Sequence, residues 1–262
     1  MEFAEGVPCW VDAALPDVEG GKRFYGELFG WSFDDGWSRD DAAGGGHGHY
    51  VRASLDGRPV AALAPKADGR LPTAWTVYLA TPDAVTTAAR VAAAGGQVIT
   101  EPVPVGPFGT TGLVADPEGA VFGLWQAGSH RGFGKLREPG AYCWTEVYAR
   151  DKSVVDPFYE SVFEYGVYDV EVGGDDFRTW SPRGAAAGPD TAIGGRAVLA
   201  GSFPAEMPAH FLSYFCVADC DATAAAVRRL GGRVRTEPFD IPYGRVAVLA
   251  DNQGAAFGVL QD

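Results

Sequence analysis

Two short segments place a carboxylate two residues after a tryptophan. They read Trp10-Val-Asp12 and Trp144-Thr-Glu146. Residues two apart on a β-strand share a face, so each carboxylate is expected beside its indole ring. Burial in an apolar cleft raises the pKa of a carboxylic acid, which suits it to general acid or base chemistry. Asp12 and Glu146 are therefore candidate catalytic residues.

Two tyrosines occupy the corresponding positions of later strands. Counting back from the start of the following helix aligns Tyr78 with Asp12. The same count aligns Tyr214 with Glu146. A tyrosine hydroxyl can orient a carbonyl group or stabilise an oxyanion, so Tyr78 and Tyr214 are also candidate catalytic residues. Each half of the chain is expected to present one carboxylate and one phenol to one cavity; a packed tryptophan with a structurally bonded carboxylate is the alternative.

Other residues are candidate ligand contacts. Gly123 and Gly258 are expected on the cavity side of a final strand, where a missing side chain leaves room for a bulky ligand. Arg245 follows a Tyr-Gly pair and can bind an anionic group, with an ion-paired surface arginine as the alternative. The expected ligand contacts are Trp10, Thr76, Gly123, Trp125, Trp144, Arg245 and Gly258.

These candidates recur because the chain contains an internal duplication. Residues 74–126 and 210–261 share a Gly-Gly pair, a Glu-Pro pair and a closing Phe-Gly motif, at an offset of 136 residues that becomes 135 after Glu-Pro. The segments before them match at an offset of 134. This predicts two domains, 1–128 and 139–262, joined by the glycine-rich, polar segment 128–135.

Each half divides again into a strand, a helix and further strands. Asp17 is a plausible helix N-cap, and Gly30 is expected to end that helix. Asp83 is expected to cap the helix of the second quarter. The buried stripe of that helix is expected to comprise Val85, Ala88, Ala89 and Ala92. The repeated unit is β-α-β-β-β, an α+β arrangement, and two units together predict an eight-stranded curved sheet around a ligand cavity.

These modules resemble the vicinal oxygen chelate superfamily. The resemblance is carried by Phe24-Tyr-Gly-Glu-Leu-Phe-Gly-Trp31, by Asp116-Pro-Glu-Gly119 before a final strand, and by the fourfold module, and it covers nearly the whole chain. The superfamily includes glyoxalases, extradiol dioxygenases, fosfomycin-inactivating enzymes and bleomycin-binding resistance proteins. The chain is most similar to two-domain actinobacterial proteins labelled hydroxylase or glyoxalase-like. The resemblance implies two cup-shaped domains of two modules each.

The resemblance also implies a divalent metal held by His or Glu on the first and last strands of paired modules. The matching positions here are Trp10, Thr76, Gly123, Trp144, Leu212 and Gly258. None of these residue types is a usual metal ligand, so we expect no metal and no other cofactor. Two weaker possibilities are His47-Gly-His49 in a glycine-rich loop and His210, two residues before a ligand-equivalent position.

Composition excludes several classes of partner. The chain of 262 residues has 21 basic and 34 acidic residues, a net charge of -13, which argues against nucleic acid and anionic membranes. Its four cysteines lack metal-binding spacing, which favours reduced thiols. The sequence shows no apolar run of about 20 residues and no secretory signal at its start, so we expect a cytoplasmic protein.

Two functions follow from these observations. The first is a metal-independent enzyme acting on a small carbonyl or an aromatic, polyketide-like compound, related to glyoxalase-like lyases and isomerases or to the hydroxylase-labelled proteins of secondary metabolism. The second is a binding protein that sequesters a planar, apolar ligand between tryptophan walls, as antibiotic-resistance proteins do. Both predict a small-molecule partner and a monomer or homodimer.

Overall fold

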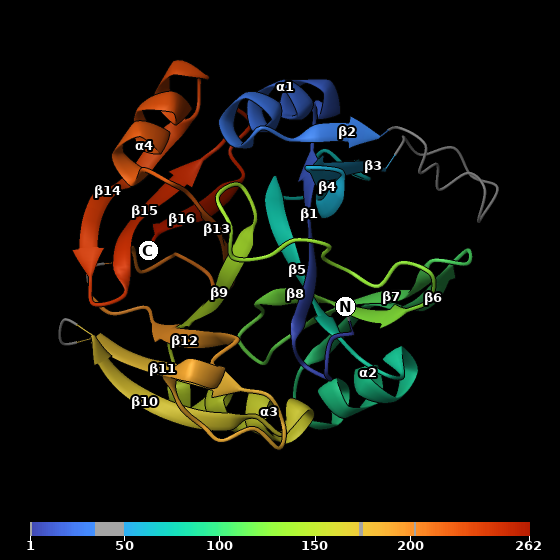
Figure 1. Ribbon diagram of the computed structural model, residues 1–262. Coiled ribbons are helices and arrows are strands. Elements are labelled where there is room, and N and C mark those ends of the chain that lie inside the picture. The colour runs from blue at the N-terminus through green and yellow to red at the C-terminus, as the bar shows by residue number, and fades with distance from the viewer. Residues whose placement is uncertain (1, 35–49, 173–174, 202) are drawn as a thin grey trace. The chain divides into compact units, whose positions relative to one another are not determined.

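The computed structural model describes residues 2–34, 50–172, 175–201 and 203–262. Within them lie four α-helices, shown in Figure 1. They are α1 (Val18–Phe29), α2 (Ala84–Ala93), α3 (Lys152–Phe163) and α4 (Cys220–Arg229). None of the helices in these residues is long and apolar enough to cross a membrane.

The strands form two sheets of eight strands each, and both have the same order. In sheet order, the first contains β2 (Ser32–Asp34), β3 (Val51–Leu55), β4 (Arg58–Pro65), β1 (Pro8–Leu15), β5 (Ala74–Ala80), β8 (Val121–Ala127), β7 (Gly109–Ala115) and β6 (Gln97–Val105). The second contains β10 (Gly166–Val172), β11 (Asp175–Ser181), β12 (Gly194–Val198), β9 (Tyr142–Ala149), β13 (His210–Cys216), β16 (Ala256–Gln261), β15 (Gly244–Ala250) and β14 (Arg233–Ile241). The predicted β-α-β-β-β modules and eight-stranded sheets are confirmed.

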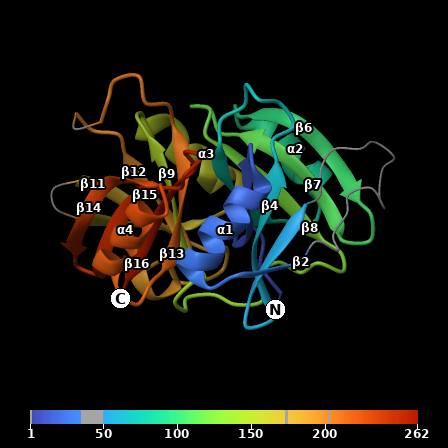
Figure 2. The same cartoon turned by 90° about the horizontal axis from the view of Figure 1, so that it is seen from above.

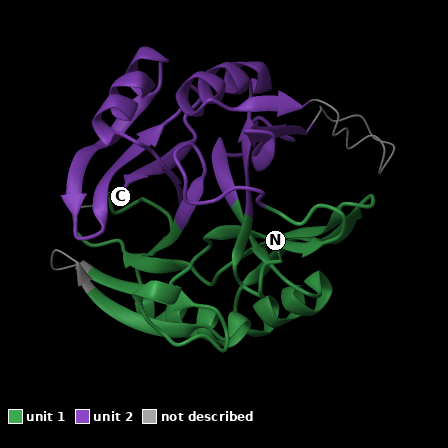
Figure 3. Ribbon diagram, viewed as in Figure 1, with its two compact units in different colours: residues 1–9, 77–132, 145–212 green, residues 10–76, 133–144, 213–262 purple. Residues whose placement is uncertain are grey.

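The chain also divides into two compact units that combine modules from both sequence halves (Figure 3). Unit 1 comprises residues 1–9, 77–132 and 145–212, and unit 2 comprises residues 10–76, 133–144 and 213–262. In unit 1, α2 contacts α3; in unit 2, α1 contacts α4, and these two helices lie side by side in Figure 2. The predicted domains 1–128 and 139–262 follow the duplication, whereas these units follow the packing of the helices.

A buried tyrosine holds the two modules of unit 2 together. The hydroxyl of Tyr25 on α1 donates to Asp251, in the turn before β16, at 2.9 Å and accepts a hydrogen bond from Trp75 at 3.0 Å. Burial and the Asp251 carboxylate raise the pKa of Tyr25 far above its ordinary value, so the hydroxyl remains a donor. Rings from both modules surround this bond, including Phe29 and Phe257.

Unit 1 repeats this bond with the equivalent residues. Tyr159 on α3 donates to Asp116, in the turn before β8, at 3.0 Å, and both residues are fully buried. Glu118 of the same turn bonds the start of α3: its carboxylate oxygens accept hydrogen bonds from the backbone amides of Arg150 and Asp151 at 2.7 and 2.8 Å. The Asp-Pro-Glu-Gly turn thus holds a helix from the other half of the sequence.

The expected helix ends are confirmed, whereas the expected buried face of α2 is mostly wrong. Asp17 and Asp83 accept backbone hydrogen bonds as N-caps, and Gly30 ends α1 with a left-handed φ of 72°. The expected stripe on α2 is wrong apart from Ala88. The side chains that are buried belong to Ala84, Thr87, Ala88 and Val91, while Val85 is 64% exposed. Thr87 lies on the buried face because its hydroxyl bonds that of Thr81 at 2.8 Å, a partner that hydrophobic periodicity does not reveal.

The tyrosine–aspartate bonds predict a matched pair of destabilised variants. Tyr25→Phe and Tyr159→Phe each leave a buried carboxylate oxygen without its hydroxyl donor. We expect each to lower the free energy of unfolding by about 1–3 kcal/mol in urea titrations. Tyr168→Phe is the control, because Tyr168 is 47% exposed. Equal effects of all three changes would contradict this role for the buried bonds.

Candidate functional site

A hydrogen-bonded chain surrounds the first candidate carboxylate, on β1 in unit 2. The hydroxyl of Tyr50 donates to Asp12 Oδ2 at 3.2 Å, and the same hydroxyl accepts from Trp10 Nε1 at 2.8 Å. Asp12 is only 8% exposed and Trp10 is 3% exposed. Because both side chains reach one hydroxyl, Trp10 and Asp12 lie on the same face of β1, as strand alternation predicts.

Two residues of this cluster escaped the sequence analysis. Tyr50 precedes β3, after a glycine-rich segment that gave no reason to single it out. Phe133, within the segment expected to be a polar linker, is buried; its ring lies 5.6 Å from that of Trp10 and stacks on Tyr142 at 4.8 Å. The expected linker at 128–135 is therefore partly a packed segment. A phenylalanine among glycines and charged residues was the available signal.

The second carboxylate, on β9 in unit 1, has a phenol partner from its own strand. The hydroxyl of Tyr148 donates to Glu146 Oε2 at 2.9 Å, and both side chains are half-buried. The Tyr148 ring stacks on His210, with centroids 5.2 Å apart and planes 8° apart. Nδ1 of His210 lies 2.9 Å from the carbonyl oxygen of Pro208. These contacts hold the Tyr148 ring, and through it the Glu146 carboxylate, in one orientation.

The two predicted glycine sites each lie under a predicted tyrosine. Tyr78 pairs with Gly123 in the register of β5 and β8, and a Cβ atom on Gly123 would lie 2.0 Å from the Tyr78 ring. Tyr214 and Gly258 repeat this arrangement, with a distance of 2.2 Å. Each glycine therefore makes room for a tyrosine ring of the same module. A ligand contact at these glycines remains a prediction.

The structure brings some of the predicted residues into contact, and others belong to different compact units. Trp10 lies with Asp12 in unit 2, and each tyrosine lies over its glycine. Asp12 and Tyr78 belong to different compact units, as do Glu146 and Tyr214. The two carboxylate–phenol pairs expected from the sequence thus remain predictions, while Tyr50 and Tyr148 are the phenols that the structure places on the carboxylates.

Three predicted ligand contacts have other neighbours. Trp125 is 8% exposed and donates from Nε1 to the carbonyl oxygen of His130 at 3.0 Å. Arg245 binds both carboxylate oxygens of Asp221 at 2.7 and 3.1 Å and one of Asp240 at 2.8 Å. These carboxylates raise the pKa of the Arg245 guanidinium, which agrees with the ion-paired interpretation. Thr76 on β5 is half-buried.

The residues at the superfamily's metal positions do not fit a metal ion. Gly123 and Gly258 have no side chain, and tyrosine rings occupy the space above them. Leu212 is apolar and buried. In the described part of the chain, no group of three or more His, Cys, Asp or Glu residues could hold a metal. His47 and His49 lie outside the described residues, and the His210 ring is stacked on Tyr148.

The four cysteines are free and buried, as reduced thiols would be. Cys9 and Cys143 occupy equivalent positions, and each sulfur lies 3.4 Å from the carbonyl oxygen of a tyrosine on the neighbouring strand, Tyr78 and Tyr214 respectively. Burial raises the pKa of the Cys9 thiol, which keeps it protonated.

The chain is similar in sequence to a known protein family and to several named proteins. Residues 10–124 match the profile of the Glyoxalase/Bleomycin resistance protein/Dioxygenase superfamily. The chain is 38% identical over 265 residues to the protein named "Putative glyoxylase CFP32" of Mycobacterium tuberculosis, covering 99% of this chain and 96% of that protein. It is 36% identical over 273 residues to the "Anthracycline biosynthesis protein DnrV" of Streptomyces peucetius, covering 99% and 94%.

Solved structures agree at the level of the fold. The Mn(II)-bound glyoxalase from Novosphingobium aromaticivorans matches with a TM-score of 0.64 and 16% identity over 98% of this chain and 82% of that one. The 2,3-dioxygenase LapB from Pseudomonas sp. KL28 matches with a TM-score of 0.62 and 15% identity over 100% and 94%. The four modules, their two sheets and these full-length relatives lead to one conclusion: the chain belongs to the glyoxalase/bleomycin resistance protein/dioxygenase superfamily, which shares the vicinal oxygen chelate fold.

Proposed function

We propose that this protein is a metal-independent enzyme acting on a small carbonyl or an aromatic, polyketide-like metabolite, with Asp12 and Glu146 exchanging protons with the substrate. The observation that carries the proposal is that each carboxylate is held by one tyrosine hydroxyl, Tyr50 or Tyr148. A base must be fixed within reach of the proton it removes, and these hydrogen bonds remove the rotational freedom of both carboxylates.

The direction of the hydrogen bonds supports a basic role. A hydroxyl donor stabilises an ionised carboxylate more than the neutral acid, which suits a group that is to accept a proton from the substrate. In the first half, Trp10 donates to Tyr50, which directs the Tyr50 proton toward Asp12. Asp12 is also largely withdrawn from water, where a charged group interacts more strongly with a substrate than it would at the surface.

The proposed substrate class also draws on the relatives. The Streptomyces peucetius relative is named for the biosynthesis of anthracyclines, which are planar aromatic polyketides. Proton transfer next to a carbonyl group is chemistry that a positioned carboxylate can perform. This supports an aromatic, carbonyl-bearing substrate for the present chain.

Isosteric amide variants test the acid–base proposal. We expect Asp12→Asn combined with Glu146→Gln to lower turnover by about 10²–10⁴-fold, because amides retain the volume but do not accept a proton. Product formation is measured with a panel of small 2-oxoaldehydes and planar aromatic polyketides, and binding is followed by tryptophan fluorescence. Asp221→Asn serves as the control, since that carboxylate pairs with Arg245 at an exposed position. Unchanged turnover in the double variant rules out Asp12 and Glu146 as acid–base residues. The two single variants show which half of the chain carries the activity.

Chelation provides a second test. Because glycine, leucine, threonine and tryptophan occupy the metal positions, we expect turnover to be unchanged by a chelator and by added Mn²⁺ or Fe²⁺. Elemental analysis of protein purified without chelator accompanies the assay. A stoichiometric divalent metal, with activity that falls on its removal, would contradict metal independence.

The alternative function is non-catalytic sequestration of a planar apolar ligand. It is favoured by Tyr78 and Trp144 on the first strands of their modules, which are half-buried and so keep part of their rings exposed, because such rings can stack on a planar molecule. This function requires no proton transfer and no metal.

Tryptophan variants separate the two functions. We expect Trp144→Phe to weaken binding of a planar polyketide by about tenfold, since a smaller ring offers less stacking area. Trp10→Phe is expected to change affinity less, because the Trp10 ring is 3% exposed and its Nε1 is bonded to Tyr50. Fluorescence titration gives the affinity, and mass analysis of the recovered ligand shows whether it has been converted. Complete conversion of the bound ligand would exclude sequestration.

A further inference from the structure

Beside its buried apolar face, helix α3 also contacts its sheet through charged residues, at positions where the sheet of its counterpart α1 has apolar ones. Asp12 pairs with Ala62, and its equivalent Glu146 pairs with Gly195, so Arg196 occupies the position of Leu63 one residue later. Arg178 lies opposite Arg196 as Val51 lies opposite Leu63. Leu63 and Val51 are 0% and 2% exposed. Two positions that hold core aliphatic residues in the first half therefore hold arginines in the second.

Arg196 forms the inner part of the resulting network. It is 1% exposed, and its Nε and Nη2 donate to the two carboxylate oxygens of Asp156 on α3 at 3.0 and 2.9 Å. Its Nη1 donates to the carbonyl and carboxylate oxygens of Asp176 on β11, both at 2.8 Å. The Arg196 guanidinium and the Asp156 carboxylate are both buried. Dissolved salt therefore screens this inner pair only weakly.

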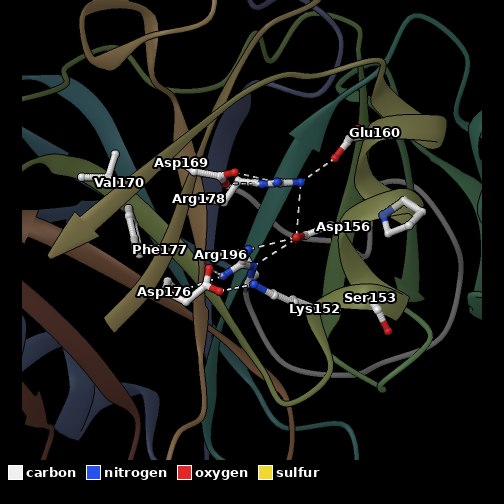
Figure 4. Close-up of a pocket in the computed structure, with 11 residues that line it drawn as sticks. Lys152, Ser153, Asp156, Glu160, Asp169, Val170, Asp176, Phe177, Arg178 and Arg196 are labelled. Atoms are coloured by element: carbon white, nitrogen blue, oxygen red, sulfur yellow. Dashed lines mark hydrogen bonds and ion pairs between the residues drawn. The ribbon is translucent and has the colours of Figure 1, made fainter. Parts of the chain in front are cut away.

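Arg178 and Lys152 form the outer part. Arg178 donates to both oxygens of Asp169 at 2.6 and 2.9 Å and to Glu160 on α3 at 2.8 Å, and Lys152 at the start of α3 pairs with Asp176 (Figure 4). The carboxylate side chains of Asp169 and Glu160 are 65% and 41% exposed, and the Lys152 side chain is 56% exposed. Hydrogen bonds from Lys152 and Arg196 lower the pKa of Asp176 to about 2, so this group is charged at neutral pH.

A groove runs along this contact. It has a volume of about 850 Å³ and is lined by residues of α3, β10, β11 and β12, including Val170 and Phe177 as well as the charged groups. Figure 4 shows the charged side chains of α3 and of the strands meeting in it. Charged contacts bordering a groove stabilise a helix less than close apolar packing, because desolvation offsets much of the attraction between buried charges.

We propose that the outer ion pairs act as an electrostatic latch on α3, whose release by screening loosens the helix from its hairpin and widens the groove. The inner Arg196–Asp156 pair sets the closed position. The exposed pairs Lys152–Asp176 and Glu160–Arg178 join the helix to β11 and set how often it opens, whereas Asp169 holds Arg178 from the neighbouring strand β10. At the equivalent positions the strands of helix α1 carry Leu63 and Val51, so the contact of α1 with its sheet is expected to depend less on exposed ion pairs. Local opening of the two equivalent helices thus responds differently to ionic strength.

Amide hydrogen exchange measured by mass spectrometry tests the latch on the full chain. Raising NaCl from about 0.05 M to about 1 M shortens the Debye length to about 3 Å and screens exposed pairs. We expect protection factors in residues 152–163 to fall by about tenfold, the effect of losing several exposed pairs. Residues 18–29 of α1 are the internal control and are expected to change by less than about twofold. An unchanged α3, or equal loosening of both helices, would overturn the proposal.

Two variants make the test specific to the charges. Lys152→Gln with Glu160→Gln removes the two exposed pairs that join α3 to β11, Lys152–Asp176 and Glu160–Arg178, and keeps the Arg196–Asp156 pair. We expect faster exchange of α3 at low salt and a flattened salt response. Glu27→Gln, which breaks the exposed pair with Arg229 in unit 2, is the matched control and should leave α3 unchanged. A salt response that persists in the double variant would show that these pairs do not form the latch.

Discussion

Two buried hydrogen bonds, Tyr25 to Asp251 and Tyr159 to Asp116, join modules that lie far apart in the sequence. Each connects a helix of one half to the turn before the last strand of the other. In each turn the backbone satisfies Oδ1 of the aspartate, and the helix tyrosine supplies a donor to the buried Oδ2, so the turn and the helix stabilise each other. The compact units consequently combine the first module with the fourth and the second with the third, while the sheets keep the order of the duplication.

The candidate site also contains hydrogen bonds from a tyrosine hydroxyl to a carboxylate, but its residues are less deeply buried. Asp12 and Glu146 each receive a tyrosine hydroxyl, but the two tyrosines come from different places. Tyr148 lies two residues after Glu146 on the same strand, where the first half has Ala14. Tyr50 supplies the hydroxyl in the first half from the residue before β3. A carboxylate held by a phenol is therefore what the halves share, although the phenol was placed independently in each.

Duplication made such divergence possible because the backbone register is kept while side chains change. Arg196 and Leu63 occupy equivalent positions of equivalent strands, yet one is in an ion-pair network and the other in an apolar core. The charged version is viable because Asp156 on α3 supplies a bidentate partner. The halves therefore share a fold and differ in how firmly a helix is held and in how a carboxylate is oriented.

The sequence by itself determined the modules, the helix caps at Asp17 and Asp83, and the common face of Trp10 and Asp12, because these depend on local spacing. Tertiary structure decided what spacing does not encode. The buried face of α2 includes Thr87, which a hydrophobic pattern passes over because its polar hydroxyl is bonded to that of Thr81, before the helix. Gly123 and Tyr78 were both singled out, but only strand register shows that one makes room for the other. Tyr50 became a site residue only when folding brought its hydroxyl between Trp10 and Asp12, since long-range partners depend on the packing of modules rather than on sequence period.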